Sequence, residues 1–489
     1  MNIAPHPKSG TPTRHVVSIN NLSNGEVETI FAVAQSFLDQ LPDKSRSYRI
    51  GRSTDIASHA ILASLFYEPS TRTRLSFESA MLRLGGDIIT SADPATSSAA
   101  KGESLADSVR VIANYADIMV IRHPRDGAAR LAAEYSPIPV INGGDGSHEH
   151  PTQTLCDLFT LKKKNRELRN LKVAISGDLK GSRTIHSFVY ALARFGAHIV
   201  PMPAPGMDLP EHVCRRLREE FRCKFDSGDG SIGALYHTPE EPHQPALFHG
   251  PEFEISFKSY SSKAEKARKQ KIAAVYVTRF QKERWTEKQQ EYPRIDAKFL
   301  KDPKYSRANV LHPLPRVGEL DASLDTDSRA IYFEQAAYGV PIRMALISLL
   351  LGLRQGKALA AFEGGFEKSK FALYEQPLST GLRCANRNCI VHEEKEAPYV
   401  KNKFHVIPAE DGRHGRLRCL YCESEIEEFV IANRRSKWYT AGTAALADVT
   451  HRNVKDYIFF ARETDALANG FHSRKHGGSK HPRMAAGHS

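Results

Sequence analysis

The sequence predicts an α/β protein with two lobes, each a doubly wound, mostly parallel sheet, followed by a small metal-binding β domain. Short β-rich runs alternate with amphipathic helical segments over residues 16–150. The same alternation returns from residue 171 to about residue 315, and it is the pattern of βαβ units. Four of the seven cysteines then form two close pairs after residue 380, which indicates a separate metal-binding domain.

The first lobe is expected over residues 1–150. Its compact apolar runs predict buried parallel strands, and they read AILASLFYE, DIMVIRH and IPVINGGD. The long apolar segment 332–357 predicts a closing helix that completes this lobe.

The second lobe is expected over residues 151–331, with strands in LKVAISGD, AHIVPMPA, IAAVYVTR and NVLHPLP. Inside it, residues 224–256 are polar, rich in Gly, Pro and His, and aperiodic, which predicts a surface loop. Residues 358–381 are expected to form a linker, and residues 382–433 the metal-binding domain. Residues 434–489 are expected to form a basic extension with a disordered end.

Composition and charge narrow the class of protein. Hydrophobic residues make up 41% and charged residues 25% of the 489 residues, which is a globular balance. No apolar run approaches a membrane span, and the first residues lack a secretory signal, so a soluble, cytoplasmic protein with no membrane partner is expected. Half of the net charge of +12 lies in residues 434–489, where ten Lys/Arg meet four Asp/Glu. That distribution argues against nucleic acid as the main partner.

The stretch LFYEPSTRTRLSFESAMLRLGG places phosphate-type donors at the start of a helix. Free N–H groups at a helix start bind anions, hydroxyls add donors, and a planar guanidinium suits phosphate oxygens. An ordinary capped helix with a surface arginine is the alternative, but consecutive donors favour an anion site. The donors are Ser70, Thr71, Arg72 and Thr73.

Other polar residues follow predicted strands, where α/β proteins place their ligands. Arg122 follows the strand DIMVI, while His150 and Gln153 begin a helix after a strand-and-glycine turn. Each residue alone is more often structural. Together they suit one small ligand that carries both a phosphate and a carbonyl group.

Seven segments agree in order with one family. FYEPSTRTR, AKGESLADS, VIRHP, HPTQTLCDLF, GDLKGSRTIHS, VTRFQKER and HPLPR resemble the motifs of aspartate carbamoyltransferase catalytic chains, over roughly residues 15–357. The resemblance implies a carbamoyltransferase fold without an organic cofactor. It also implies condensation of carbamoyl phosphate with L-aspartate, giving N-carbamoyl-L-aspartate and phosphate, an early step of pyrimidine biosynthesis.

The resemblance also implies roles for individual residues. The phosphate would be bound by Ser70, Thr71, Arg72 and Thr73, and the carbamoyl end by Arg122, His150 and Gln153. Aspartate would be bound by Lys101, Arg183, Arg279, Gln281, Leu314 and Pro315. The catalytic set would be Arg72, Thr73, Lys101, Arg122 and His150. Attack by the amine of aspartate creates an oxyanion that these donors would stabilise, and the departing phosphate can accept the proton.

Two alternatives stay open. Ornithine carbamoyltransferases share the STRTR-type loop, but their relatives carry a cysteine where this chain has HPLP, and TRFQKER favours a dicarboxylate. The other alternative belongs to a different class, a non-catalytic zinc-containing assembly or nucleic-acid-binding protein. That class predicts loss of substrate residues, and none of those named is missing.

The loop SADPATSSAAKGESLAD carries Ser97 and Lys101, which match family residues that reach into a neighbouring subunit's site. The resemblance therefore implies a homotrimer with shared sites. A flexible surface loop is the alternative when the loop is taken alone.

The cysteine pairs are Cys384 with Cys389 and Cys419 with Cys422. Four thiolates close a tetrahedral shell, which predicts one structural zinc per chain. The surrounding sequence resembles the zinc domain of the aspartate carbamoyltransferase regulatory chain, which implies a higher assembly of trimers. The 24 residues between Lys357 and Leu382 are too few for that chain's nucleotide-binding domain, which puts nucleotide regulation in doubt.

Overall fold

The computed structural model describes most of the chain in two compact units. The described residues are 13–41, 54–92, 98–226, 235–237, 271–280, 292–353, 371–376, 380–408, 415–441, 446, 449–450 and 452–473. One unit takes residues 1–370 and 388–400, and the other takes 371–387 and 401–489. Among the described helices, none is long and apolar enough to cross a membrane.

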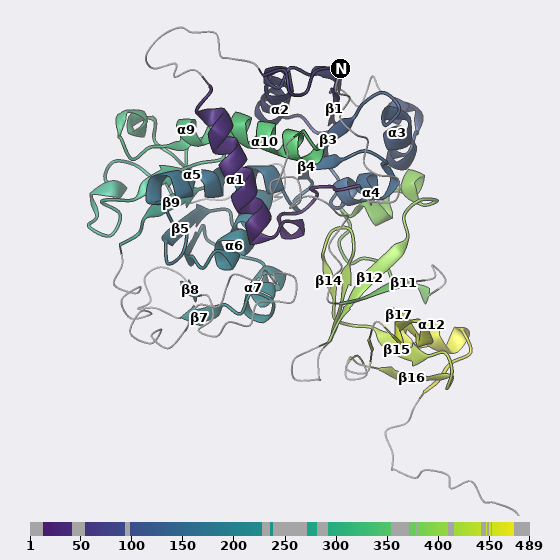
Figure 1. Ribbon diagram of the computed structural model, residues 1–489. Helices are drawn as coiled ribbons and strands as arrows, with labels where there is room; N and C mark the ends of the chain where they lie inside the picture. The colour runs from purple at the N-terminus through teal and green to yellow at the C-terminus, as the bar shows by residue number, and fades with distance from the viewer. Residues whose placement is uncertain are drawn as a thin grey trace, which may run out of the picture. The chain divides into compact units, whose positions relative to one another are not determined.

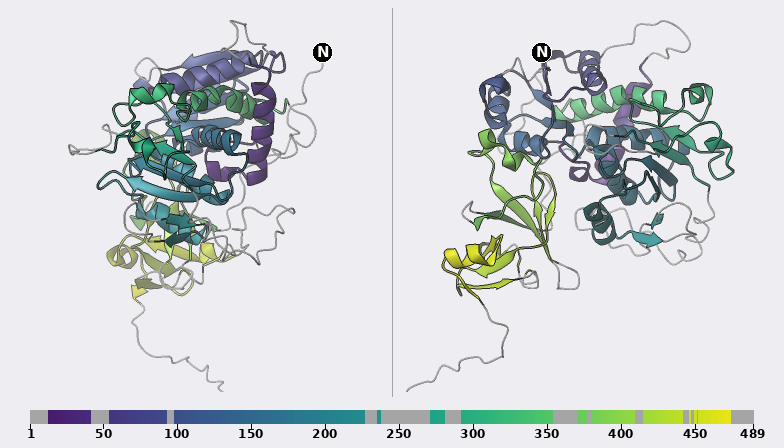
Figure 2. Two further views of the ribbon diagram at one scale, coloured as in Figure 1. Left: turned by 90° about the vertical axis from the view of Figure 1, so that its left-hand side faces the viewer. Right: turned by 180° about the vertical axis from the view of Figure 1, so that it is seen from behind.

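The first lobe is built on a four-stranded parallel sheet in the order β2-β1-β3-β4. Its strands are β1 (Ile61–Phe66), β2 (Asp87–Ser91), β3 (Ile118–His123) and β4 (Val140–Asp145). The three strands predicted from apolar runs are confirmed as β1, β3 and β4. Its helices are α1 (Asn24–Leu38), α2 (Thr71–Arg83), α3 (Leu105–Ile112), α4 (Ala128–Tyr135) and α5 (Pro151–Asn165). Figure 2 shows these strands flanked by helices.

The predicted closing helix consists of two helices, α9 (Tyr332–Ala337) and α10 (Gly339–Leu350). Tyr338 separates the two helices: it is the C-cap residue of α9 and the N-cap residue of α10, which begins at Gly339. α10 packs against α1 and α2 of the first lobe (Figure 1). The last residues of the prediction, 354–357, lie outside the described residues.

The second lobe holds a six-stranded sheet in the order β10-β9-β5-β6-β8-β7. The strands are β5 (Lys172–Gly177), β6 (His198–Pro203), β7 (Lys224–Asp226), β8 (Leu235–His237), β9 (Ala274–Val277) and β10 (Asn309–Leu311). The helices are α6 (Arg183–Arg194) and α7 (Glu211–Glu219). The four predicted strands are the parallel ones, β10, β9, β5 and β6.

The loop predicted at 224–256 is wrong for six residues. β7 and β8 form an antiparallel pair at the edge of the sheet, where Tyr236 pairs with Ile199 of β6. Strands this short carry too few residues for a period to appear in the sequence. The rest of 227–256 lies outside the described residues.

The second unit contains two four-stranded sheets. The first, in the order β11-β12-β13-β14, is antiparallel and the second has the order β17-β15-β16-β18. Their elements are β11 (Ala372–Gln376), β12 (Asn402–Ile407), β13 (Arg416–Cys419), β14 (Glu425–Ile426), β15 (Val430–Asn433), β16 (Trp438–Ala441), β17 (Tyr457–Phe460), α12 (Glu463–Ala468) and β18 (His472–Ser473). Short 3-10 helices in the chain are η1 (Ile19–Asn21), η3 (Ser98–Lys101), η6 (Phe299–Lys301), η7 (Ala322–Thr326), η9 (Ile390–His392), η10 (Glu394–Glu396) and η12 (Val454–Asp456).

Two predictions for the C-terminal region need correction. Residues 372–376, expected in a linker, form β11 and pair with β12. Residues 434–473 were expected in a basic extension, but their described part forms β16, β17, α12 and β18 and shares a small core with β15. That core is Val430, Ala432, Tyr439, Ile458, Phe460, Ala466 and Phe471. The expected disordered end, 474–489, lies outside the described residues.

Candidate active site

The start of α2 lies directly after β1, where the sequence predicted an anion site. Ser70 is the N-cap residue, with an extended backbone, and its hydroxyl makes no capping hydrogen bond. That leaves the hydroxyl and the first N–H groups of a 13-residue helix available to a ligand. Thr71 and Arg72 are exposed, whereas Thr73 is buried.

Two predicted arginines from different lobes meet on one carboxylate. Arg122, on β3, donates from Nη2 to Glu68 Oε1 at 3.0 Å. Arg183, the first residue of α6, donates from Nη1 and Nη2 to the two Glu68 oxygens, each at 3.0 Å. Burial alone would raise the pKa of Glu68, but the two guanidinium groups hold it below its usual value. The arginines therefore form an anion site that Glu68 fills in this structure.

The turn after β4 supports the same arginines through its backbone. Arg183 also donates to the carbonyl oxygen of Gly146 at 2.6 Å. Gly144 has a φ of +116°, and a Cβ there would lie 3.2 Å from Arg122 Nη1 and 3.3 Å from Arg183 Cζ. A side chain at 144 would be strained and would crowd both guanidinium groups.

His150 lies at the start of α5, buried beside the arginines. Burial, and then the charges of Arg122, Arg183 and Arg343, hold its pKa well below the usual value. The imidazole is therefore neutral at physiological pH and can donate one hydrogen bond. Gln153, one turn later, is half-buried and donates from its amide nitrogen to Asp157 at 2.8 Å.

The loop with Leu314 and Pro315 lies on the second lobe after β10. Leu314 N donates to Nδ1 of the buried His312 at 2.8 Å. Arg279, which follows β9, donates to its neighbour Phe280 O at 3.1 Å. Burial, and then the charge of Arg279, lower the pKa of Arg72. Burial lowers the pKa of His312, and the charges of Arg316 and Arg72 add to this effect.

Of the described residues that were predicted for the site, Lys101 has no contact with this group among those above. Lys101 is exposed at the end of η3, in a stretch that leads into α3. Ser97 and Gln281 lie outside the described residues.

Sequence reasoning missed Glu68 and Asp157, which bind predicted site residues through hydrogen bonds. Glu68 is in the FYEPSTRTR stretch itself, directly after a buried strand, and that position was an available signal. Asp157 is a carboxylate in the middle of a helix whose neighbours are all buried. An acidic residue in such a segment indicates a buried hydrogen-bond network.

The four predicted metal ligands come together. The Sγ atoms of Cys384, Cys389, Cys419 and Cys422 all lie within 4.8 Å of one another, and all four residues are buried. The chain's seven cysteines form no disulfide. In a tetrahedral site with Zn–S bonds of about 2.3 Å, the sulfur atoms lie ~3.8 Å apart. The cluster therefore fits a four-coordinate metal.

Comparison with known proteins agrees with this geometry. Residues 14–163 match the carbamoyl-P binding domain of the aspartate/ornithine carbamoyltransferase family, and residues 247–350 match its Asp/Orn binding domain. The aspartate carbamoyltransferase catalytic subunit of Picrophilus torridus is 42% identical over 342 residues, which cover 69% of this chain and 98% of the relative. This chain belongs to the aspartate carbamoyltransferase family.

Solved members of the family have the same fold over the two lobes. The catalytic subunit of M. jannaschii aspartate transcarbamoylase aligns with a TM-score of 0.55 and 37% identity, over 71% of this chain and 100% of that chain. The Trypanosoma cruzi enzyme, in complex with N-(phosphonacetyl)-L-aspartic acid, aligns with a TM-score of 0.52 and 29% identity, over 71% and 98%.

The C-terminal region matches a second component of the same enzyme system. Residues 378–432 match the metal binding domain of the aspartate carbamoyltransferase regulatory chain. This range contains all four clustered cysteines. The aspartate carbamoyltransferase catalytic and regulatory features thus occur together in one chain.

Proposed function

We propose that this chain catalyses the reaction of carbamoyl phosphate with L-aspartate to give N-carbamoyl-L-aspartate and phosphate. The observation that carries the proposal is the convergence of Arg122 and Arg183 on Glu68 at the start of α2. Arginines from both lobes share one anion site, next to a helix start with free donors. A site of this kind suits two anionic substrates held side by side.

Carbamoyl phosphate binds at the first lobe. Its phosphate accepts hydrogen bonds from the N–H groups and hydroxyls of Ser70, Thr71 and Thr73 at the start of α2. The guanidinium of Arg72 pairs with the same phosphate. Arg122, His150 and Gln153 hold the carbamoyl end. The substrate's charge can replace Glu68 at Arg122, because a phosphate or carboxylate offers the same paired oxygens.

Aspartate binds mainly through the second lobe. Its two carboxylates are matched by Arg183 and Arg279, with Gln281 and the backbone of Leu314 and Pro315 completing the pocket. Arg183 at the start of α6 and Arg279 just after β9 provide the charge that a dicarboxylate needs. An ornithine side chain would bring a cation to the same place, which is why aspartate is the preferred substrate.

Catalysis rests on positioning and on stabilised charge. The amine of aspartate attacks the carbamoyl carbon, and Thr73, Arg122 and His150 donate to the oxyanion that forms. A neutral His150 donates a hydrogen bond from its ring N–H and carries no acidic second proton, in agreement with its lowered pKa. The departing phosphate takes the amine's proton, so no protein base is required.

The active assembly is a homotrimer in which Ser97 and Lys101 reach a neighbouring site. Exposed apolar side chains on the first lobe support a subunit contact there. They are Leu75 and Leu82 on α2, Ile89 on the edge strand β2, and Val111 and Tyr115 at the end of α3. A cytoplasmic location stays a prediction.

The cysteine cluster holds one structural zinc per chain, through Cys384, Cys389, Cys419 and Cys422. Four thiolates leave zinc no open position, so the metal supplies folding energy and takes no part in the reaction. The reaction itself needs no organic cofactor, since both reacting groups belong to the substrates. The metal-binding domain links trimers into a larger assembly.

The test is an assay of the purified full chain for N-carbamoyl-L-aspartate and phosphate, with ornithine run in parallel. Arg72→Ala is expected to lower kcat/KM at least 100-fold, because a charge-assisted fork to the phosphate is lost. Arg83→Ala, at the opposite end of the same helix, is the matched control and should stay within a few-fold of wild type. Citrulline formation, or equal activity of both variants, would refute the assignment.

A further inference from the structure

Asp157 is a buried carboxylate that joins three elements of the first unit. Its Oδ1 accepts hydrogen bonds from Gln153 Nε2 at 2.8 Å and from Gln335 Nε2 at 2.6 Å. Its Oδ2 accepts from the hydroxyl of the buried Tyr276 at 2.8 Å. The donors come from α5, α9 and β9, so one side chain connects the two lobes with the closing helices.

The carboxylate fixes the orientation of the Gln153 amide. An ionised carboxylate only accepts hydrogen bonds, so the amide nitrogen of Gln153 must face Asp157. The amide oxygen of Gln153 is then left to accept from a ligand. A carbamoyl NH2 group could donate to this oxygen. If the Gln153 amide were flipped, its own NH2 would face the carbamoyl NH2, and two donors cannot form a hydrogen bond.

The network continues from Asp157 to the loop that carries Leu314. The other end of the Gln335 amide, Oε1, accepts from His312 N at 2.9 Å. His312 Nδ1 accepts from Leu314 N at 2.8 Å, while Nε2 lies 2.7 Å from Glu319 Oε1. His312 can accept from Leu314 only while Nδ1 carries no proton, and its burial lowers its pKa accordingly. Three residues in series, Asp157, Gln335 and His312, thus separate Gln153 from Leu314.

We propose that Asp157 is a positioning residue that orients Gln153 toward the carbamoyl group and couples that orientation, through Gln335 and His312, to the loop at Leu314 and Pro315. The proposal rests on the proposed function, because Gln153 and Leu314 belong there to the two substrates. In this proposal the network links the orientation of Gln153, at the carbamoyl end of the site, to the position of the Leu314 loop at the aspartate end.

Protonation of Asp157 should weaken the hydrogen bonds through which it orients Gln153. Burial raises the pKa of Asp157 to about 6, against the three hydrogen bonds and the charge of Arg343. Arg343, on α10, is the facing cation, and it also donates to Cys156 Sγ at 3.7 Å. Tyr276 and Cys156 are the other titratable neighbours, and burial raises the pKa of both. They remain neutral near pH 6, where Asp157 changes charge.

The experiment compares Asp157→Leu and Asp157→Asn with Thr160→Val in the full chain. Asp157→Leu removes the acceptor and should raise KM for carbamoyl phosphate 10- to 100-fold, since a hydrogen bond to a charged group holds Gln153. Asp157→Asn keeps an oxygen toward both amides and should recover most of that loss. Thr160→Val removes a buried hydroxyl one turn later, bonded to Cys156 O, and should leave both KM values unchanged.

Two further readouts separate positioning from a merely structural role. As pH falls through about 6, kcat/KM should decrease less in Asp157→Asn than in wild type. Part of the decrease remains in both, because the phosphate of the substrate also titrates there. Gln335→Met, which cuts the network beyond Asp157, should raise KM for aspartate more than KM for carbamoyl phosphate. If all variants lower kcat alone, or if Asp157→Asn keeps the wild-type decrease, the positioning role is wrong. Absence of carbamoyltransferase activity in the wild type would instead refute the proposed function.

Discussion

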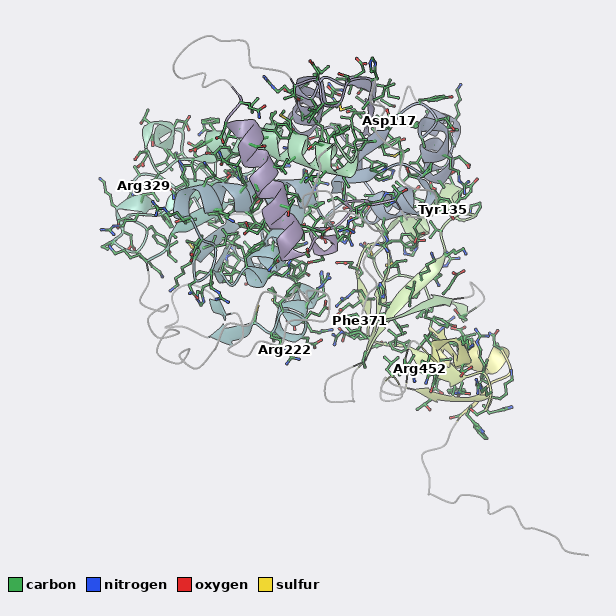
Figure 3. The ribbon with its side chains drawn as sticks, viewed as in Figure 1. Asp117, Tyr135, Arg222, Arg329, Phe371 and Arg452 are labelled. Atoms are coloured by element: carbon green, nitrogen blue, oxygen red, sulfur yellow. The ribbon has the colours of Figure 1, made fainter. Side chains whose placement is uncertain are left out.

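Glu396 should control the stability of the start of α3. Its Oε1 accepts from Leu105 N at 2.6 Å, and its Oε2 lies 3.5 Å from Ala106 N. The Ser104 hydroxyl accepts from Asp107 N, so the three first N–H groups of α3 are all occupied. The carboxylate is buried, and it belongs to the segment 388–400 of the first unit. Further contacts of this segment include the hydroxyl of Tyr135 (Figure 3), which donates to Tyr399 O at 2.6 Å.

Glu396→Ala leaves one buried N–H, that of Leu105, without its short hydrogen bond. An unsatisfied buried donor costs about 1–3 kcal/mol. The longer bond from Ala106 adds little. We expect a loss near 2 kcal/mol, which corresponds to roughly 30-fold faster exchange of the α3 amides if they exchange by local opening.

Hydrogen exchange of residues 105–112, followed by mass spectrometry, measures this loss. Glu394→Ala is the matched control, because Glu394 is exposed on the same 3-10 helix. Glu396→Gln keeps an oxygen acceptor and should retain protection. Unchanged exchange in Glu396→Ala, or equal loss in the Ala and Gln variants, would contradict the capping role.

The pH dependence gives a second check on Glu396. Burial raises its pKa in the folded chain, against the two backbone hydrogen bonds. The folded state therefore binds the proton more tightly than the unfolded state does. This stabilisation is complete below the unfolded pKa of Glu, near 4.3, and is lost as pH rises through the higher folded value. Wild type should lose protection relative to Glu396→Gln across that window.

Three other outcomes are expected. Arg279→Ala should raise KM for aspartate at least 10-fold with little change in KM for carbamoyl phosphate; equal changes in both steady-state constants would argue against the aspartate pocket. Mixing Lys101→Ala with Arg72→Ala chains should restore part of the activity if sites are shared, and no recovery after verified subunit exchange would count against sharing. Cys419→Ser should abolish stoichiometric zinc by elemental analysis while the trimers keep substantial activity, so loss of activity in a folded trimer would contradict a structural metal.

The strands that could be predicted are those buried on both faces. β1, β3 and β5 are almost wholly buried, and such strands appear in a sequence as continuous apolar runs. β2 lies at the edge of its sheet, its residues are exposed or half-buried, and it was missed. The sheet in residues 430–473 was missed for another reason, because its runs WYTA and YIFF are only four residues long, which is too short for a period to appear.

The site could be predicted residue by residue but not contact by contact. Motifs identify Arg122 and Arg183, yet they give no sign that both donate to Glu68, which lies 54 and 115 residues away in the chain. The same limit hid the contacts of Asp157 with Tyr276 and Gln335. Partners brought together by the fold leave no periodic signal in the sequence. Their geometry has to come from the structure.

The charge balance of the site explains why it should select aspartate. Arg122 and Arg183 share a single carboxylate, and burial, then the charge of Arg279, lower the pKa of Arg72. Two guanidinium groups on one carboxylate leave one positive charge in excess at the Glu68 site. A phosphate together with two carboxylates offsets that excess, because each anion relieves the repulsion between the cations. An ornithine side chain would add a further cation to the same site, and the repulsion would oppose its binding.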